Sequence, residues 1–247
     1  MQHFFNKSVR CMLSTVLVTS CLGLSHWAVA EEVDAYDESW QDFGENEDPW
    51  ENTNRAIFRF NDALDRWALK PVAKAYQKIT PDVVEEGVHN VFRNVGEVRN
   101  LTHNILQLKM HDAGVDTARF MFNTTFGVLG FFDVATKMGL QRSDEDFGQT
   151  LGSWGVKSGP YVVLPLFGPS TVRDTLAMYP DSYVSAYRYI NDVPVRNSVF
   201  ALNVVDTRSS LLSVERMISG DKYRFIRNAY LQNREFRVMD GNVVDDF

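Results

Sequence analysis

FMFNTTFGVLGFFDV, residues 120–134, holds nine apolar side chains and two glycines, with no charge between Arg119 and Asp133. The run is too short to cross a bilayer as a helix, which needs about 20 apolar residues. Gly127 and Gly130 also interrupt helical continuity within it. A helical hairpin that lies in a membrane surface has this composition. The alternative is a segment of a large aromatic core.

Aromatic side chains also crowd other parts of the chain. Near neighbours are Phe58 and Phe60, Phe120 and Phe122, Phe131 and Phe132, and Tyr183, Tyr187 and Tyr189. For any single one of these residues, burial in an aromatic core is the simpler interpretation. For the whole run at 120–134, the membrane-surface interpretation stays open beside it.

The first 30 residues have the pattern of a secretory signal peptide. Basic residues precede a mostly apolar segment, and a small-residue cleavage site ends at Ala30. Residues 18–21 also fit a lipoprotein signal, in which cleavage precedes Cys21 and that cysteine is acylated. We expect cleavage after Ala30, because the segment that follows Cys21 is apolar where lipoproteins carry a polar spacer. A chain that begins at Glu31 has no cysteine.

Charge is distributed unevenly. Residues 31–48 hold nine acidic side chains and no basic one, so we expect residues 31–47 to be an acidic flexible arm. Subtracting Lys7 and Arg10 from the 25 basic residues, and the nine acids from the 32 acidic ones, leaves 23 of each. A formally neutral body without a Lys/Arg cluster argues against nucleic acid as a partner.

Capping patterns and apolar spacing predict one all-α domain over residues 48–238, followed by a tail at 239–247. The sequence Asp48-Pro49-Trp50-Glu51 has the form of a capping box that opens a helix to about Ala68, and Pro71 ends or restarts it. Thr80-Pro81-Asp82 repeats this signature before a helix with valines on one face. Further helices are predicted over residues 97–109, 113–124, 172–190, 195–218 and 221–237. Strand is limited to residues 161–164.

No catalytic or metal-binding constellation is visible. The three histidines outside the leader lack the spacing of four that places two ligands on one helical face, so we expect no metal and no cofactor. Ser153 lies outside a Gly-x-Ser-x-Gly elbow. The acids Asp144, Glu145 and Asp146 are either paired carboxylates for hydrolysis or, more simply, a solvated loop with an ion pair to Arg142. We therefore expect a protein that is not an enzyme.

Several motifs share one order along the chain. They are DPWE at 48–51, NR at 54–55, FND at 60–62, KP at 70–71, NVGEVRN at 94–100, the run at 120–134, RSDEDFGQTLGSWGV at 142–156, GPYVVLPLFGPSTVRD at 159–174 and AY at 229–230. Together they resemble the MlaA/VacJ family of outer-membrane phospholipid-transport lipoproteins over residues 48–237. The residues that carry the match best are Asp48, Pro49, Asn54, Arg55, Phe60, Asn61, Arg142, Asp146, Phe147, Gly148, Gly159, Pro160, Gly168 and Asp174.

The resemblance implies a function as well as a fold. It implies a helical ring in the inner leaflet of the outer membrane, on its periplasmic side, with a central channel and a hydrophobic hairpin. Such a protein takes mislocalised phospholipids from the outer leaflet and passes them to a periplasmic carrier, which maintains lipid asymmetry. It associates with trimeric porins and catalyses no reaction.

The same resemblance implies which residues meet lipid. In the hinged hairpin beside the channel they are Phe122, Phe126, Gly127, Gly130, Phe131, Phe132 and Asp133. The channel wall would draw on Tyr161, Leu164, Phe167 and Arg173, with Arg173 either on a phosphate or paired with Asp174 or Asp146. Two other interpretations remain open: a periplasmic lipid-degrading enzyme with residues 120–134 as a lid, and a porin-accessory surface factor.

Overall fold

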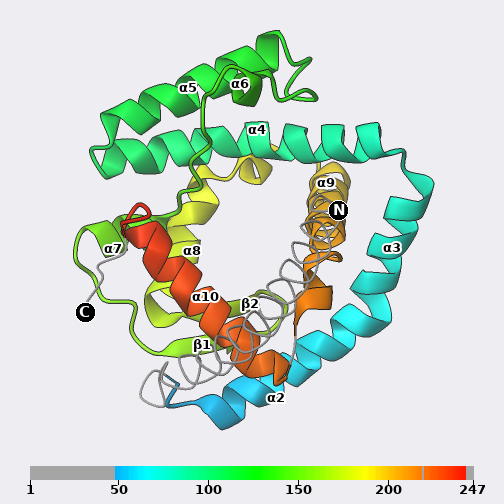
Figure 1. The fold of residues 1–247 in the computed structure, drawn as a ribbon, viewed down its shortest axis with the longest axis vertical. Helices are drawn as coiled ribbons and strands as arrows, with labels where there is room; N and C mark the ends of the chain where they lie inside the picture. The colour runs from blue at the N-terminus through cyan, green and yellow to red at the C-terminus, as the bar shows by residue number, and fades with distance from the viewer. Residues whose placement is uncertain (1–47, 219, 243–247) are drawn as a thin grey trace, which may run out of the picture. The chain divides into compact units, whose positions relative to one another are not determined.

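The computed structural model describes residues 48–218 and 220–242 (Figure 1). The predicted signal peptide with Cys21, the predicted acidic arm and most of the predicted tail lie outside these residues. From Asp48 onward the chain forms one compact unit. Within the described ranges, no helix is both long enough and apolar enough to cross a bilayer.

The first helical segment passes through three elements without a break. Helix α2 spans Glu51–Leu64, a π-helical turn spans Asp65–Leu69, and α3 spans Lys70–Ile79. Pro71 lies in the first turn of α3 and has no N–H to donate, while the N–H of Lys70 bonds to the carbonyl of Asp65 in the π pattern. The helix predicted to reach about Ala68 therefore continues to Ile79.

The two predicted capping patterns do not form, so this prediction is wrong. The residue that caps the start of α2 is Trp50 and the one that caps α4 is Pro81, and neither makes a side-chain capping bond. Asp48 cannot cap α2 because its carboxylate is engaged elsewhere. It accepts hydrogen bonds from Asn54 at 2.7 Å and from the hydroxyl of Tyr223.

A long helical pair comes next along the chain. Helix α4 (Asp82–Leu106) and α5 (Met110–Thr125) lie side by side, followed by α6 (Val134–Lys137) and α7 (Phe147–Ser153) (Figure 1). The sequence pattern predicted two helices that meet near residue 97, whereas α4 runs unbroken over 25 residues. Gly96 does not interrupt it, because one helical glycine costs only about 1 kcal/mol.

A small antiparallel sheet follows α7. Strand β1 (Tyr161–Leu164) is the predicted strand, and it pairs with β2 (Gly168–Thr171) so that Tyr161 lies opposite Thr171. The sequence missed β2 because its residues, GPST, include proline and glycine, which are poor strand formers. Gly168 starts β2 with a φ of 83°, which suits glycine in the turn between the strands.

The C-terminal half is helical. It comprises α8 (Val172–Val184), a 3₁₀ turn (Ala186–Tyr189), α9 (Val193–Ser210), a second 3₁₀ turn (Val214–Met217) and α10 (Lys222–Val238). The helix predicted to reach residue 218 ends at Ser210. The hydroxyls of Ser209 and Ser210 donate to the carbonyls of Asp206 and Thr207, which satisfies backbone groups locally at this end.

Contacts between these elements form a closed circuit within the unit. Helix α2 contacts β1, β2 contacts α10, α10 contacts α7, α7 contacts α4, α4 contacts α9, and α9 contacts α3, which continues from α2 (Figure 1). With one two-stranded sheet among many helices, this arrangement confirms the mostly helical single domain predicted from the sequence.

Apolar packing is concentrated at one place in the circuit. Tyr161 and Val163 of β1 meet Tyr223 of α10, and the rings of Phe58 and Tyr223 pack edge to face at 5.5 Å between centroids. Partly buried side chains around this core are Ile57, Phe58, Tyr230 and Leu231. Other aromatic residues considered for a core are exposed, among them Phe60, Phe132 and Tyr189.

Candidate functional site

The apolar run that follows Arg119 forms an exposed tip between α5 and α6. At this tip the exposed fractions of Phe126, Val128 and Leu129 are 66%, 65% and 72%, and that of Phe132 is 48%. Exposed apolar side chains gathered at one place mark a surface that contacts protein, ligand or lipid. The hairpin residues predicted to act together are thus brought together.

Aromatic contacts hold the tip in shape. The rings of Phe122 and Phe126 stack at 6.0 Å, and those of Phe131 and Phe132 meet edge to face at 5.0 Å between centroids. The ring of Phe131 also lies against α4, where a Cβ on Gly87 would overlap it. Phe131 therefore docks the tip onto α4 while its neighbours stay exposed.

The backbone of the tip is tightly folded. Val128, Leu129 and Gly130 have φ angles of 54°, 60° and 93°, a left-handed region that is unusual for a β-branched residue such as Val128. The N–H groups of Gly130 and Phe132 donate at 2.8 Å to the carbonyls of Asn123 and Gly127. These bonds offset the strain of the left-handed residues.

Two glycines are required by this folding. A Cβ on Gly127 would overlap the carbonyl oxygen of Phe132, and one on Gly130 would lie 2.6 Å from the Cβ of Asn94. Both positions thus need glycine for close approach, in addition to the backbone freedom that the sequence suggested.

A buried ionic cluster anchors the hairpin to α4. The guanidinium of Arg119, which is 1% exposed, donates to Glu97 at 2.9 Å, to Asp133 at 3.1 Å and to the carbonyl of Leu140 at 2.6 Å. Asn123 joins the cluster by donating to Asp133 at 3.1 Å. One side chain of α5 thereby fixes both the preceding helix and the returning chain.

Asp133 is the point at which the hairpin returns to this cluster. Burial opposes its charged form, but hydrogen bonds from Thr136, Arg119 and Asn123 outweigh that effect and lower the pKa of Asp133 to about 2. Its carboxylate also caps α6 by accepting from the N–H of Thr136 at 3.0 Å. Asp133 is therefore ionised across the physiological pH range and fixes the returning end of the hairpin to the cluster.

The rest of the α4–α5 interior is polar as well. Asn104 donates to Asp116 at 2.7 Å, and the hydroxyl of Ser143 donates to the same carboxylate at 2.8 Å. Asn94 donates to Thr124 at 2.9 Å. The helical pair is thus held together inside by amides, carboxylates and a guanidinium rather than by aliphatic packing.

Burial in the described residues reflects the same organisation. Only seven hydrophobic side chains are buried, four of them alanines, against twenty-one polar or charged ones. Large apolar side chains are instead exposed along most elements, including Trp67, Leu108, Leu166 and Leu176. Apolar atoms on the outside and hydrogen-bonded polar groups on the inside are the arrangement expected of a body whose surroundings are partly apolar.

Two motif asparagines fasten β1 to α2. The amide of Asn54 donates to the carbonyl of Tyr161 at 3.0 Å and accepts from the N–H of Val163 at 2.9 Å. Asn61, seven residues on, makes the same pair of bonds just beyond, both at 2.9 Å. The two side chains act as a strand edge for β1, so their role is structural.

Other motif residues near them also support the fold. Asp48, 5% exposed, accepts from Tyr223 and lies 3.5 Å from the guanidinium of Arg227. Arg55 forms ion pairs with Glu51 at 2.6 Å and with Asp221 at 2.8 Å. Pro49 and Phe60 are exposed, and Gly159 and Pro160 lead into β1.

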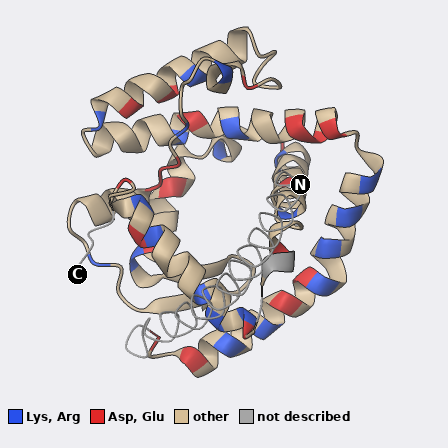
Figure 2. Ribbon diagram, in the orientation of Figure 1, with Lys and Arg blue, Asp and Glu red and all other residues tan. Residues whose placement is uncertain are grey.

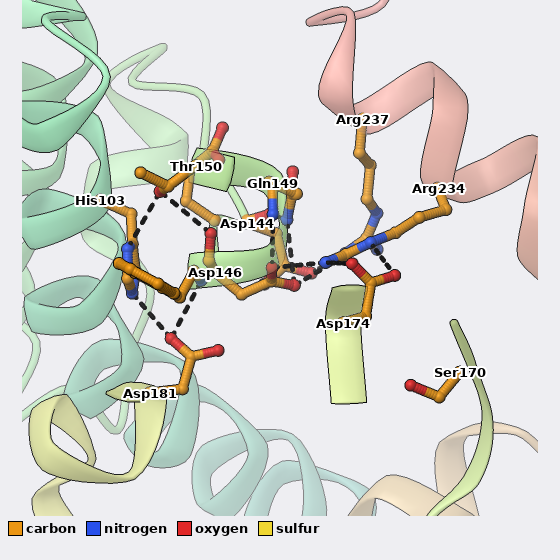
Figure 3. A network of polar contacts seen from close by, with 12 residues as sticks. His103, Asp144, Asp146, Gln149, Thr150, Ser170, Asp174, Asp181, Arg234 and Arg237 are labelled. Carbon is orange, nitrogen blue, oxygen red and sulfur yellow. Dashed lines mark hydrogen bonds and ion pairs between the residues drawn. The ribbon is translucent and has the colours of Figure 1, made fainter. Parts of the chain in front are cut away.

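A second ionic network joins α7, α8 and α10 (Figure 3). Arg234 binds the two oxygens of Asp146 at 2.5 and 2.6 Å and lies 2.8 Å from Asp174. Burial opposes the charge on Asp146, but Arg234 outweighs it and holds the pKa of Asp146 well below its usual range. Gly148 leaves room for the network, because a Cβ there would overlap both Arg234 and Asp174.

The acidic loop at residues 144–146 includes the ion pair considered for Arg142, whose guanidinium lies 3.9 Å from Asp144, and its acids also contact side chains from other elements. Asp144 pairs with Arg237 at 2.6 Å, Glu145 accepts from Gln107 at 2.7 Å, and Asp146 belongs to the network of Figure 3. Arg142 lies 3.5 Å from Glu97. Each acid thus has its own partner.

Each of the three histidines in the described part of the chain lies beside an aspartate. His89 lies 2.8 Å from Asp206, His103 lies 2.9 Å from Asp181, and His111 lies 3.0 Å from its neighbour Asp112. Among the described residues there is no group of three histidine, cysteine or acidic side chains placed to hold a metal ion. The ring of Phe147 packs near His103 at 6.0 Å between centroids.

The side chains suggested for a channel wall do not gather at one surface. Tyr161 is 1% exposed inside the apolar core and Leu164 is partly buried, whereas Phe167 is 67% exposed. Arg173 is buried and donates to Asp174 at 2.9 Å and to the carbonyl of Val156 at 3.2 Å. Of the partners considered for Arg173 in the sequence analysis, Asp174 is the one that it contacts in the structure.

Several key residues were not identified from the sequence. Arg119, Glu97 and Arg234 organise the two ionic clusters, and Tyr223 organises the apolar core. Their partners lie far away in the chain, for example 88 residues between Asp146 and Arg234. No local pattern signals such pairs.

Comparison with known proteins gives consistent matches. A family model described as MlaA lipoprotein matches residues 46–237. The chain is 30% identical over 240 residues to the intermembrane phospholipid transport system lipoprotein MlaA of Haemophilus influenzae, covering 95% of this chain and 91% of that protein. It is 33% identical over 202 residues to the protein of the same name from Escherichia coli, covering 79% and 80%.

A solved structure is similar in fold. It comes from a study entitled "Structural basis for maintenance of bacterial outer membrane lipid asymmetry" and aligns with a TM-score of 0.69 at 31% sequence identity. The alignment covers 78% of this chain and the whole of that one.

Proposed function

The chain belongs to the MlaA lipoprotein family, and we propose from this premise that it removes mislocalised phospholipids from the outer leaflet of the outer membrane. In this proposal, lipid passes through a channel in the helical body to a periplasmic carrier, which returns it and so maintains lipid asymmetry. The protein acts as a conduit and catalyses no reaction.

The observation that carries the proposal is the reversed burial of the body. Among the described residues, twenty-one polar side chains are buried against seven hydrophobic ones, while many large apolar side chains are exposed. A body of this kind is stable when acyl chains cover its exterior, because the exposed apolar area then leaves water. A polar interior likewise suits the headgroup of a lipid that passes near it.

The hairpin at residues 126–132 is the candidate gate. Its tip offers apolar side chains to acyl chains, and its base is fixed by Arg119 and Asp133. A strained, glycine-dependent turn between two fixed points can take a second conformation at modest cost. We propose that shifts of this tip control the passage of lipid.

Location and partners follow from the same proposal. The protein would lie on the periplasmic side of the outer membrane after export by its signal peptide, held by its apolar exterior and, if Cys21 is acylated, by lipid chains. Its partners would be phospholipids, a trimeric porin and a periplasmic lipid carrier.

The test measures phospholipid exposed in the outer leaflet of cells that lack this protein. Complementing genes encode the wild type, Gly127→Ala, or Gly114→Ala as a matched control, since a Cβ on Gly114 meets no atom within 4 Å. We expect deletion to raise the exposed phospholipid, Gly114→Ala to restore the normal level, and Gly127→Ala to fail. Normal levels in the deletion strain, or full restoration by Gly127→Ala, would contradict the proposal.

Two further measurements separate the other interpretations. Release of fatty acid from phospholipid by the purified protein would indicate a lipid-degrading enzyme. A porin-accessory factor would leave the leaflet composition unchanged in the deletion strain while altering the cell surface.

A further inference from the structure

Exposed basic side chains are spread along α2, the π turn and α3. We call Arg59, Arg66, Lys74 and Lys78 the basic stripe, and all four are exposed. Figure 2 shows α3 with blue positions and no red one, since its only charged residues are lysines. In the sequence these bases are too far apart to form a cluster, and the helical fold aligns them.

The acids of this segment do not neutralise the stripe. Asp62 pairs with Lys222 at 2.6 Å, and Asp65 pairs with Arg208 at 2.7 Å, so both serve contacts with the C-terminal half. Of the stripe, only Arg66 shares an acid, Asp62. Within residues 48–218 and 220–242, Arg59, Lys74 and Lys78 have no ion-pair partner.

An apolar stripe runs beside the basic one. Its members are Phe60, Leu64, Trp67, Val72 and Ile79, with exposed fractions of 56%, 42%, 83%, 53% and 79%. Trp67 is the most exposed of the large hydrophobic residues in the described part of the chain. Tryptophan beside basic side chains is typical of helices at a membrane–water interface.

The π turn lets each stripe continue from α2 into α3 on the same side of the helical segment. In an unbroken α-helix, Phe60 and Val72 would point about a third of a turn away from each other, since the helix repeats every 3.6 residues. The π turn at Asp65–Leu69 takes more residues per turn and offsets this drift. Both side chains are accordingly more than half exposed, while Ala73 is fully buried.

We propose that α2, the π turn and α3 lie along the surface of a bilayer, with the apolar stripe among acyl chains and the basic stripe on the phosphates of anionic phospholipids. The proposal deepens the proposed function and rests on it, because it requires the body to lie in a bilayer. Charge complementarity identifies the occupant: unpaired bases attract phosphates, and the adjacent apolar side chains require a hydrocarbon phase that an acidic protein surface lacks.

Vesicle binding tests the proposal with the full mature chain. The probes are vesicles of phosphatidylcholine alone and vesicles of phosphatidylcholine mixed with phosphatidylglycerol. The variant combines Arg59→Gln, Lys74→Gln and Lys78→Gln. The matched control combines Lys137→Gln, Lys157→Gln and Arg224→Gln, which replace three exposed bases outside α2, the π turn and α3 and remove the same amount of charge.

We expect the stripe variant to bind mixed vesicles about 100-fold more weakly than the wild type, because one base at an anionic surface adds about fivefold. Binding to phosphatidylcholine alone should hardly change, and added salt should reduce the difference by screening. The control should retain most of the affinity of the wild type for mixed vesicles.

The possible failures differ from one another. Suppose that the wild type binds both kinds of vesicle. If the affinity of the stripe variant for mixed vesicles then equals that of the wild type or that of the control variant, this proposal is wrong and the proposed function stands. If the wild type binds neither vesicle, membrane seating fails, and with it both proposals.

Discussion

Two regions of this molecule are built on opposite principles. Around Tyr161 and Tyr223, aromatic rings and Val163 fill an apolar core between β1 and α10. Between α4 and α5, Glu97, Arg119 and their amide partners fill the interior, and apolar side chains face outward. The first region is organised like a protein in water, and the second like one with hydrocarbon outside it.

The difference shows where each region draws its stability. An apolar core is stabilised by removal of area from water, at about 25 cal/mol per Å². A polar interior is stabilised only if every buried group keeps its partner, because one unpaired charge there costs several kcal/mol. The hairpin region is therefore specific in geometry and sensitive to single changes.

The largest effect should come from breaking the buried cluster of the hairpin region. Arg119→Met leaves Asp133 without its cation and Glu97 with only Arg142, at 3.5 Å, and should lower the free energy of unfolding by about 3–5 kcal/mol. Thermal unfolding in detergent micelles measures this loss, and limited proteolysis locates it. Arg224→Met, which removes an exposed base, is the control and should change little. A normal melting temperature for Arg119→Met would mean that the cluster is not what holds the hairpin.

A smaller loss is expected in the aromatic region. Burial raises the pKa of Tyr223, so its hydroxyl stays protonated and donates to Asp48. Tyr223→Phe keeps the ring and removes this bond, and should cost about 2 kcal/mol, since bonds to charged groups contribute about 1.5–3. Equilibrium unfolding monitored by fluorescence tests it. Tyr189→Phe, on an exposed ring, is the matched substitution and should be nearly neutral.

The contrast also explains how far the sequence could predict this molecule. The bounds of strand β1 and helix α10 were predicted to within one residue, because the spacing of apolar residues and the residues that flank an element are local signals. In α4 the valine spacing was visible, yet Val84 and Val95 are exposed, and Asn94, Glu97 and Asn100 occupy the inside. Spacing gives a face its composition, but whether that face meets a core or a lipid depends on the surroundings.

Predictions for the sites divide in the same way. The hairpin tip could be identified, because an uncharged run interrupted by glycines is a local feature. The ionic clusters could not, since Arg234 pairs with acids 88 and 60 residues away. Asp48 shows the reverse error: a local capping signal was present, and a distant hydroxyl, that of Tyr223, took the carboxylate instead.

Lowering the pH should destabilise the hairpin region by a moderate amount through protonation of Asp133. The pKa of Asp133 is lowered to about 2, so its carboxylate stabilises the fold above its unfolded value near 4 and loses that contribution as pH falls from about 4 to 2. The expected loss is at most about 2 kcal/mol. Proteolysis of the hairpin at stepped pH measures it, and Asp133→Asn should remove the step in this range. Cleavage that is equal at pH 5 and pH 2 in the wild type contradicts this assignment.

The smallest effect on stability belongs to the exposed tip, and it sharpens the comparison most. Phe126→Ser and Leu129→Ser remove apolar side chains that are 66% and 72% exposed, so the free energy of unfolding in detergent should change by about 0.5 kcal/mol or less. If the tip faces acyl chains, the same pair should weaken binding to phosphatidylcholine vesicles, where hydrocarbon replaces water around those rings and chains. A large loss of stability with unchanged vesicle binding would instead make the tip part of a core, and the two regions would then follow one principle.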